Sequence, residues 1–474
     1  MLLFLFFVAA PMVGFVISLK RSWQRFTFGL VCFMTISGFL APAEWGLTVL
    51  FDTDYRGHAR GFHFFFNEAL ALALIIASYF DGKVKTRLSP PGLWLYLLYC
   101  FLSLISIVNA PNHLYFWMAA VKAFKVILIF IAAYNFFRSE KDIQFFLTVM
   151  SWTMLWEMVV VLKMKYADHV YQIGGTFEHQ NSLCMYASMI GLVLLATGCG
   201  PPYPRNNLHI VGFCASAIVV QSTLSRAGLV IFAIGAVGVL GLGLVDQITK
   251  RRLRIIAVLG VIAAVGLTFT LRTIINRFND YYNSESNHSR VLLNRASKRM
   301  LHDYPLGIGW NNYGLMINHP YPYGNEIDAW FRSEYQTVDK KERKGISESH
   351  YWLLLAENGY EGFISYMIFI GVFFWWNLAG AWFFRKTFLG CFSFGIAAGC
   401  GVNYLQSLYE RVLTQPRNLM LWLIVLAATS RIETWRQAAK KLTRSDRKAR
   451  RSRSRISENE DAFEINRMKL NEQG

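Results

Sequence analysis

Long apolar runs separated by short polar segments fill the chain from its first residues to about residue 430. A helix needs roughly 20 apolar residues to cross a bilayer, and we count thirteen runs near that length. The pattern therefore predicts an all-α, polytopic transmembrane helical bundle of about 12 to 13 spans. The predicted spans are 2–19, 26–42, 63–80, 92–109, 117–137, 144–164, 181–199, 208–222, 227–245, 255–272, 360–383, 389–406 and 417–430.

Two polar stretches interrupt this pattern. Residues 273–349 are polar, aromatic and charged, which predicts a large loop between the tenth and eleventh spans. The tail, residues 431–474, includes the basic run RQAAKKLTRSDRKARRSRSRIS, which favours disorder and contact with an anionic cytoplasmic leaflet. The expected organisation is thus spans 1 to 10 in residues 1–272, then the loop, then the last spans in residues 350–430, then the tail.

The distribution of basic residues predicts the orientation. Loops that would be cytoplasmic hold 15 Lys and Arg, whereas the short loops on the other side hold five. The first apolar run has no basic residue before it, unlike a signal peptide, so we expect a retained span with its N-terminus outside. The loop 273–349 then lies outside.

Composition narrows the possible functions. A content of 54% hydrophobic and 16% charged residues is too apolar for a soluble enzyme of 474 residues. The net charge of +18 suits orientation and contact with membrane lipids; nucleic-acid binding is the alternative, but the basic tail directly follows a span, so no nucleic-acid partner is expected. All seven cysteines fall in predicted spans, as packing residues do.

Motifs for cofactors are not found in the sequence. It has no CxxC pair and no His/Cys spacing typical of metal sites. It also has no GxxxxGK[ST] or GxGxxG loop for nucleotide phosphates. We therefore expect neither a metal nor another cofactor.

Several ionisable groups gather at the predicted outer side, where their cost at membrane depth favours a functional role. Lys122 and Lys125 share a helix face and either extend to the interface or form a cationic wall for an anionic headgroup. His179 and Asn181, in GGTFEHQNSLCMYASM, either belong to a capped helix start, with Asn181 as the cap, or orient a substrate.

Two arginines suggest a phosphate site. Arg226 lies in a break between two spans, as an interfacial anchor or as a ligand, and Arg290 lies on a helix-like segment of the outer loop. A guanidinium group is well shaped for bidentate contacts with phosphate. Together these residues would offer two such groups to a diphosphate.

His350 is the strongest single candidate. An imidazole titrates near neutral pH, so His350 suits the role of proton acceptor for a hydroxyl group, although a structural histidine at a helix start is the alternative. Glu357 lies seven residues later on the same helix face and would orient or tune His350, unless it is exposed to solvent. The segment GIGWNNYG before it combines aromatic and amide side chains, which suit sugar rings.

Five short motifs in order resemble the O-antigen ligase family, which includes related O-antigen polymerases. They read GTFEHQN, LSRAG, HSRVLLNRA, GIGWNN and SHYWLLLAENGYEG, and the resemblance covers roughly residues 115–430. The sequence departs from the family pattern in its extra first span and in YQIG before Gly174. That stretch lacks a basic residue, which Lys165 or the pair Lys122 and Lys125 would replace.

The resemblance implies a C-type membrane glycosyltransferase in the bacterial inner (cytoplasmic) membrane. Such an enzyme moves glycan from undecaprenyl diphosphate to a hydroxyl of lipid A-core or of another repeat unit, on the periplasmic side. By the same resemblance Arg226 and Arg290 bind the diphosphate, and His350 positions or deprotonates the acceptor hydroxyl. Neither a nucleotide sugar nor a metal is implied.

Two other functions fit the sequence. A polysaccharide polymerase shares the same motifs and differs only in its acceptor. A transporter of an anionic solute belongs to another class, and it would favour internal repeats and broken helices at the midplane of the membrane. We find neither feature, so the sequence favours the glycosyltransferase.

Overall fold

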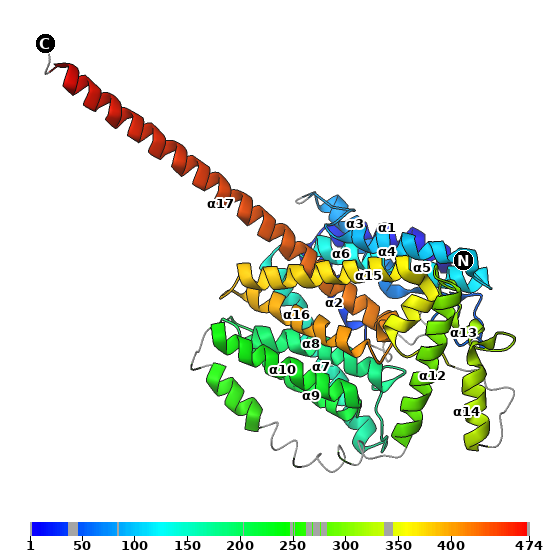
Figure 1. The fold of residues 1–474 in the computed structure, drawn as a ribbon. Coiled ribbons are helices and arrows are strands. Elements are labelled where there is room, and N and C mark those ends of the chain that lie inside the picture. Colours follow the sequence, from blue (N-terminus) through cyan, green and yellow to red (C-terminus); the bar gives the residue numbers. More distant parts are fainter. Residues whose placement is uncertain are drawn as a thin grey trace.

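Helices make up most of the described chain (Figure 1). The computed structural model describes residues 2–36, 46–82, 85–201, 203–246, 250, 252–261, 268, 275, 282–335 and 345–471. The first ten labelled helices are α1 (Leu2–Ser18), α2 (Arg21–Phe33), α3 (Phe66–Asp81), α4 (Leu93–Leu104), α5 (His113–Lys125), α6 (Ile127–Phe136), α7 (Glu140–Tyr166), α8 (Gln180–Gly198), α9 (Asn206–Ser222) and α10 (Arg226–Asp246). The later ones are α12 (Tyr282–Asp303), α13 (Tyr313–Met316), α14 (Asn325–Tyr335), α15 (His350–Phe383), α16 (Phe388–Gln406) and α17 (Pro416–Asn471).

Short elements connect these helices. Three are 3₁₀ turns, η1 (Ile105–Asn109), η2 (Pro322–Gly324) and η3 (Val412–Thr414). Two strands, β1 (Gly46–Val49) and β2 (Phe62–Phe65), form an antiparallel hairpin in which Gly46 pairs with Phe65.

The all-α, polytopic membrane class predicted from the apolar runs is confirmed. Five described helical stretches are long and apolar enough to cross a membrane: His113–Phe136, Glu140–Tyr166, Gln180–Gly198, His350–Phe383 and Phe388–Gln406. Other predicted spans coincide with helices outside these five stretches, such as α2 and α10, and the span 255–272 lies largely outside the described residues. The number of 12 to 13 spans therefore stays a prediction.

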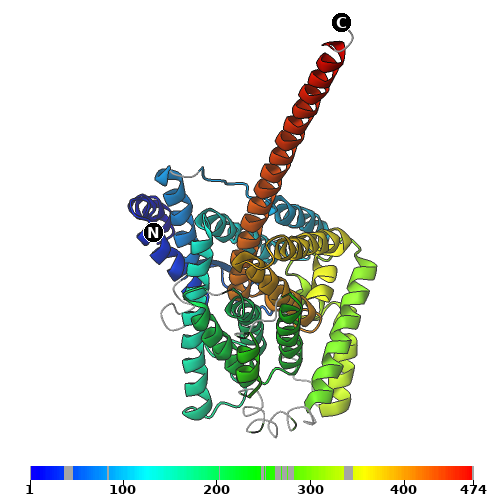
Figure 2. The same ribbon diagram turned by 90° about the vertical axis from the view of Figure 1, so that its left-hand side faces the viewer.

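Helix α8 is the centre of the bundle. It packs against α9, α10 and α16 (Figure 2). Its apolar stretch is buried throughout. The outer helices instead expose large aromatic side chains, among them Trp152, Trp375 and Trp382. An exposed aromatic surface of this kind is costly in water but suits contact with lipid.

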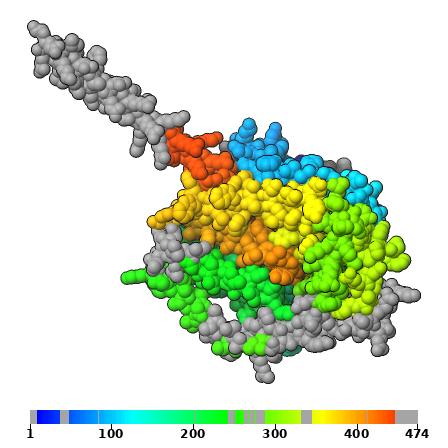
Figure 3. All heavy atoms as spheres, in the orientation of Figure 1, coloured from blue at the N-terminus to red at the C-terminus, as the bar shows by residue number. Residues whose placement is uncertain are grey.

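The described part of the segment 273–349 packs at one end of the bundle. Helix α12 lies along the first half of α15, and α13 and α14 lie close by (Figures 1 and 3). At the other end of α15, Nζ of Lys440 in α17 lies 5.8 Å from the ring centre of Phe383. The two polar stretches of the sequence are thus at opposite ends of α15, as the predicted topology requires.

The tail differs from its prediction of disorder. Helix α17 continues as one helix to Asn471 and projects away from the bundle (Figure 1). Its sequence after Pro416 contains neither Gly nor Pro and is rich in Ala, Lys, Arg and Glu, which are good helix formers. Because the membrane-side part of α17 already provides a helical nucleus, the basic run extends it without a new nucleation cost.

A kink in α15 shapes the end that carries His350. Gly359 has φ 68° and ψ −171°, a backbone conformation open essentially to glycine alone. The segment before α13 enters this kink, where the amide of Ile308 donates to the carbonyl of Ala356 (2.9 Å) and that of Tyr360 donates to the carbonyl of Pro305 (3.1 Å). These bonds fix the outer segment against the turn of α15 that carries Glu357.

We predict that Gly359→Ala destabilises the protein by about 1–3 kcal/mol, the usual cost of such a backbone conformation for other residues. A Cβ atom at Gly359 would also lie 2.4 Å from the carbonyl carbon of Leu306. Thermal unfolding in detergent should show a lower Tm for this variant. Gly371→Ala in the same helix is the matched control, because no atom lies within 4 Å of its added Cβ. Equal Tm values for both variants would contradict the assigned strain.

Candidate active site

The start of α15 places His350 inside the protein. Ser349 precedes the helix, and the amide of His350 donates to the carbonyl of Ser407 (3.0 Å), which fixes this start to the end of α16. The His350 side chain is only 4% exposed. Its Nε2 lies 3.2 Å from the hydroxyl of Tyr366, and its buried Nδ1 has no hydrogen-bond partner in the described part of the chain.

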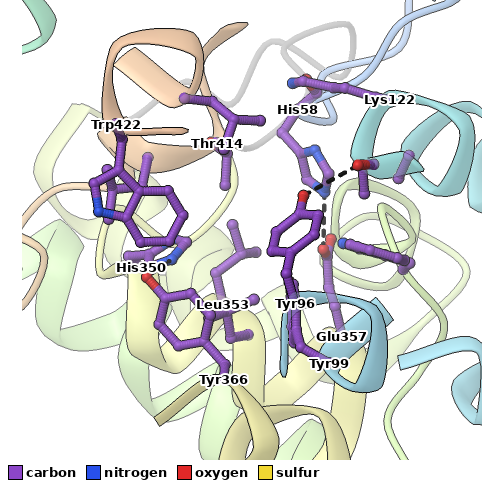
Figure 4. Close-up of a pocket in the computed structure, with 16 residues that line it drawn as sticks. His58, Tyr96, Tyr99, Lys122, His350, Leu353, Glu357, Tyr366, Thr414 and Trp422 are labelled. Atoms are coloured by element: carbon purple, nitrogen blue, oxygen red, sulfur yellow. Dashed lines mark hydrogen bonds and ion pairs between the residues drawn. The ribbon is translucent and has the colours of Figure 1, made fainter. Parts of the chain in front are cut away.

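His350 lines a cavity whose wall is mainly aromatic and aliphatic (Figure 4). The cavity holds about 570 Å³ of space between atoms, its open mouth included. Its lining residues are His58, Tyr96, Tyr99, Ala119, Lys122, Ala123, Trp310, His350, Leu353, Leu354, Glu357, Tyr366, Leu413, Thr414, Leu419 and Trp422. Three residues predicted for the site, Lys122, His350 and Glu357, therefore meet at one cavity although more than 200 positions separate Lys122 from the other two.

Glu357 is buried, which excludes the solvent-exposed alternative, and it contacts a different histidine from the one predicted. Its Oε2 lies 3.1 Å from Nε2 of His58, and its Oε1 accepts the amide of Tyr313 (3.2 Å). This pairing is not visible in the sequence, because His58 comes from the loop between β1 and β2, far from α15 along the chain. The contact pairs His58, rather than His350, with the carboxylate (Figure 4).

The two lysines of α5 have separate environments. Nζ of Lys122 donates to the carbonyl of His58 (2.9 Å) at the cavity. Nζ of Lys125 lies 2.8 Å from Oε1 of Glu68 and also contacts the carbonyl of His63, and Lys125 does not belong to the cavity lining. A buried Lys125 needs a carboxylate, and α3 supplies it. That the two lysines bind an anionic headgroup stays a prediction.

Arg290 lies in a second group of charged residues, close to the cavity. Its Nε bonds to the carboxylate of Glu348, and its Nη2 lies 2.8 Å from Oε1 of Glu410. The side-chain amide of Asn181 (Nδ2) also donates to Oε1 of Glu410. Burial lowers the pKa of Arg290, but the two carboxylates outweigh this and raise it. Burial and the negative charge of Glu348 raise the pKa of Glu410 to about 7, against the opposing effect of Arg290.

His179, rather than Asn181, caps α8. The amide of Asn181 donates to Nδ1 of His179 (3.3 Å), whose extended backbone immediately precedes Gln180. The cap prediction was therefore wrong by two positions, and the Asn181 side chain is left to bind Glu410. Burial lowers the pKa of His179, and nearby Arg411 and Arg290 add to this against Glu348.

Arg226 is the first residue of α10 and is half-buried. Two residues later, a Cβ at Gly228 would lie 2.2 Å from Sγ of Cys184 in α8 and 3.2 Å from Nε2 of Gln406 in α16. The start of α10 is thus beside the first turns of α8 and the last turn of α16, the end of the bundle that also holds Asn181 and Glu410. That Arg226 and Arg290 bind a diphosphate together stays a prediction, because the cavity lining includes neither among the described residues.

Two ionisable residues of this region were not among the candidates selected from the sequence. His58 lies in the loop FDTDYRGHARGF, and Arg411 follows Glu410. Arg411 interacts electrostatically with Glu348, Glu410 and Glu357, so it connects the Arg290 group with the cavity; burial is the main cause of its lowered pKa. Both residues are ionisable groups in predicted outer loops, the criterion that selected the others. Among the described residues, no group of three His, Cys, Asp or Glu side chains suits a metal ion.

The amides of GIGWNN, which suggested sugar binding, hold the main chain instead. Asn311 accepts the amide of Ala59 (3.0 Å) and donates to the carbonyls of Ala59 (2.7 Å) and Tyr115 (3.1 Å). The hydroxyl of Tyr55 also bonds to the carbonyl of Asn311. These contacts fix the loop that carries His58 against the outer segment and α5.

Comparison with known proteins finds a family match that includes several of these residues. No curated protein matches the chain. Residues 211–367 match the family model described as O-antigen ligase. The matched segment, narrower than the resemblance seen in the motifs, contains Arg226, Arg290, His350 and Glu357, whereas His58 and Lys122 lie outside it. Over this segment the protein is similar to the O-antigen ligase family, which confirms the resemblance drawn from its motifs.

Proposed function

We propose that this protein is a glycosyltransferase that moves glycan from undecaprenyl diphosphate to an acceptor hydroxyl, on lipid A-core or a similar molecule, at the periplasmic face of the bacterial inner membrane. One observation carries the proposal: Lys122, His350 and Glu357 line one cavity at an end of the membrane helices, close to the group formed by Arg290, Glu348 and Glu410. The family match over residues 211–367 supports the same chemistry.

Arg290 is the proposed ligand of the donor diphosphate. Its guanidinium group is ion-paired with Glu348 and Glu410, so a diphosphate binds by exchange with at least one of these carboxylates. Glu410 suits this exchange, because its raised pKa of about 7 lets it take up a proton near neutral pH and release Arg290. Arg226, at the same end of the bundle, is the proposed second guanidinium group.

The transfer step needs no nucleotide. The acceptor oxygen bonds to the anomeric carbon of the glycan as the bond from that carbon to the phosphate oxygen breaks, and the electron pair leaves with the diphosphate. Negative charge therefore grows on the leaving group, where arginine donors stabilise it most. His350 is the proposed contact for the acceptor hydroxyl, because its buried Nδ1 has no other partner among the described residues.

The first test is transfer in proteoliposomes with purified undecaprenyl-diphosphate-linked glycan. We expect wild-type protein to form product on added lipid A-core. Elongated donor, formed when excess donor is the only acceptor, would instead identify a repeat-unit polymerase of the same family. No product with either acceptor, from protein with a cooperative thermal unfolding transition, would refute the proposed function and favour transport of an anionic solute.

Arg290→Ala should lower the rate of transfer by about 10² to 10³, as expected for loss of a donor that acts on the charge of the transition state. Arg295→Ala is the matched control, because Arg295 is exposed on the same helix, α12. Initial rates at fixed donor concentration measure the difference. Similar rates for both variants would remove Arg290 from the proposed site.

His350→Ala should lower the rate at least about tenfold, the equivalent of one hydrogen bond to the acceptor. His302→Ala, at the exposed end of α12, provides the control. The loss should appear as a raised KM for the acceptor with the KM for the donor unchanged. An unchanged acceptor KM would argue against this contact.

A further inference from the structure

We propose that His58, paired with Glu357, is the catalytic base that takes the proton from the acceptor hydroxyl. This inference rests on the proposed glycosyl transfer and adds a residue from outside the segment that matches the family model. The observation behind it is a buried histidine and carboxylate pair on the wall of the cavity that also holds His350 (Figure 4).

The geometry of the pair indicates which nitrogen of the His58 ring carries the hydrogen. The side chains of His58 and Glu357 are 6% and 2% exposed, and Nε2 lies 3.1 Å from Oε2. A carboxylate only accepts hydrogen bonds, so Nε2 carries the hydrogen and Nδ1 of the neutral ring carries a lone pair. That Nδ1 is buried and has no hydrogen-bond partner among the described residues. It is therefore able to accept the hydrogen of a hydroxyl group bound in the cavity.

His350 is less suited to become positively charged. It is the first residue of α15, where the helix dipole disfavours a cation. Its Nε2 faces the hydroxyl of Tyr366, and no described carboxylate bonds to the ring. His58 instead has the carboxylate of Glu357 as a direct partner, which stabilises the imidazolium formed by proton transfer. The two histidines thus have different proposed roles: His350 contacts the acceptor hydroxyl, and His58 takes its proton.

The surroundings of His58 keep the ring neutral before reaction. The groups that face it are Glu357 and His350 from α15, Lys122 from α5 and Arg411 from the α16–α17 connection. Tyr96 and Tyr99 from α4 line the same cavity. Burial lowers the pKa of His58 and outweighs Glu357, which raises it, while Lys122 and Arg411 lower it further. A neutral ring at pH 7 is the form that accepts a proton.

The fold fixes the base in place. Asn311 bonds to both main-chain groups of Ala59, the neighbour of His58, and Lys122 bonds to the carbonyl of His58 itself. In the transfer step, the acceptor proton moves to Nδ1 of His58 as the acceptor oxygen bonds to the anomeric carbon. The negative charge that leaves with the diphosphate and the positive charge on His58 thus arise at two separate groups of residues.

The test measures kcat and KM against pH in proteoliposomes, with the acceptor that the wild-type protein uses. His58→Gln keeps an amide donor for Glu357 but cannot accept a proton, so we expect kcat to fall by about 10²–10⁴. Glu357→Gln should also lower kcat. In that variant the acid limb of the pH profile should move to lower pH, because loss of the carboxylate lowers the pKa of His58. His63→Gln, in strand β2 of the same hairpin, should match wild type.

The possible outcomes separate this inference from the function on which it rests. An inactive wild type refutes the proposed function. An active wild type with an unchanged kcat in His58→Gln overturns the role of His58 and leaves the function intact. A lower kcat in both variants, with an acid limb that does not move in Glu357→Gln, would mean that the pair only anchors the loop, and it would also overturn the inference.

Discussion

The carboxylate of Glu357 is the group on which the arrangement of this end of the molecule depends. A charged carboxylate costs several kcal/mol to bury unless partners replace its water. Glu357 finds these partners in two other segments, at Nε2 of His58 and at the amide of Tyr313. One buried charge therefore holds together the β1–β2 hairpin, the segment that enters the kink at Gly359, and α15.

The need of a buried charge for a partner also explains the ion pairs of Lys125 and Arg290. Lys125 is paired with Glu68, and Arg290 is paired with Glu348 and Glu410. Each pair joins segments far apart in sequence. Arg290 differs from Lys125 because one of its partners, Glu348, has a side chain that is 40% exposed, and the other, Glu410, has a pKa near 7. These two features are the ones that suit the proposed exchange of a carboxylate for an anion at Arg290.

Hydropathy was sufficient to predict the helical membrane fold, because a bilayer requires long apolar helices. It also placed Lys122, His350 and Glu357 at one end of the bundle, since each lies near the predicted outer edge of a span. Hydropathy could not identify which side chains contact one another. That Glu357 would contact His58, or Lys125 would contact Glu68, depends on the rotation of each helix and on the path of the hairpin. The helix of the tail was not predicted, because the charge of residues 431–474 was given more weight than their helix propensity.

A site that binds a diphosphate and also accepts a proton has two opposing electrostatic needs. In the proposed function, cations such as Arg290, Arg411 and Lys122 favour the anionic donor, but a nearby cation also makes a histidine a weaker base. Lys122 and Arg411 do lower the pKa of His58. A buried carboxylate beside the histidine offsets this effect where it is needed, without lowering the positive charge at Arg290. The position of Glu357, in contact with His58 and apart from the carboxylates that pair with Arg290, would serve both needs of the proposed reaction.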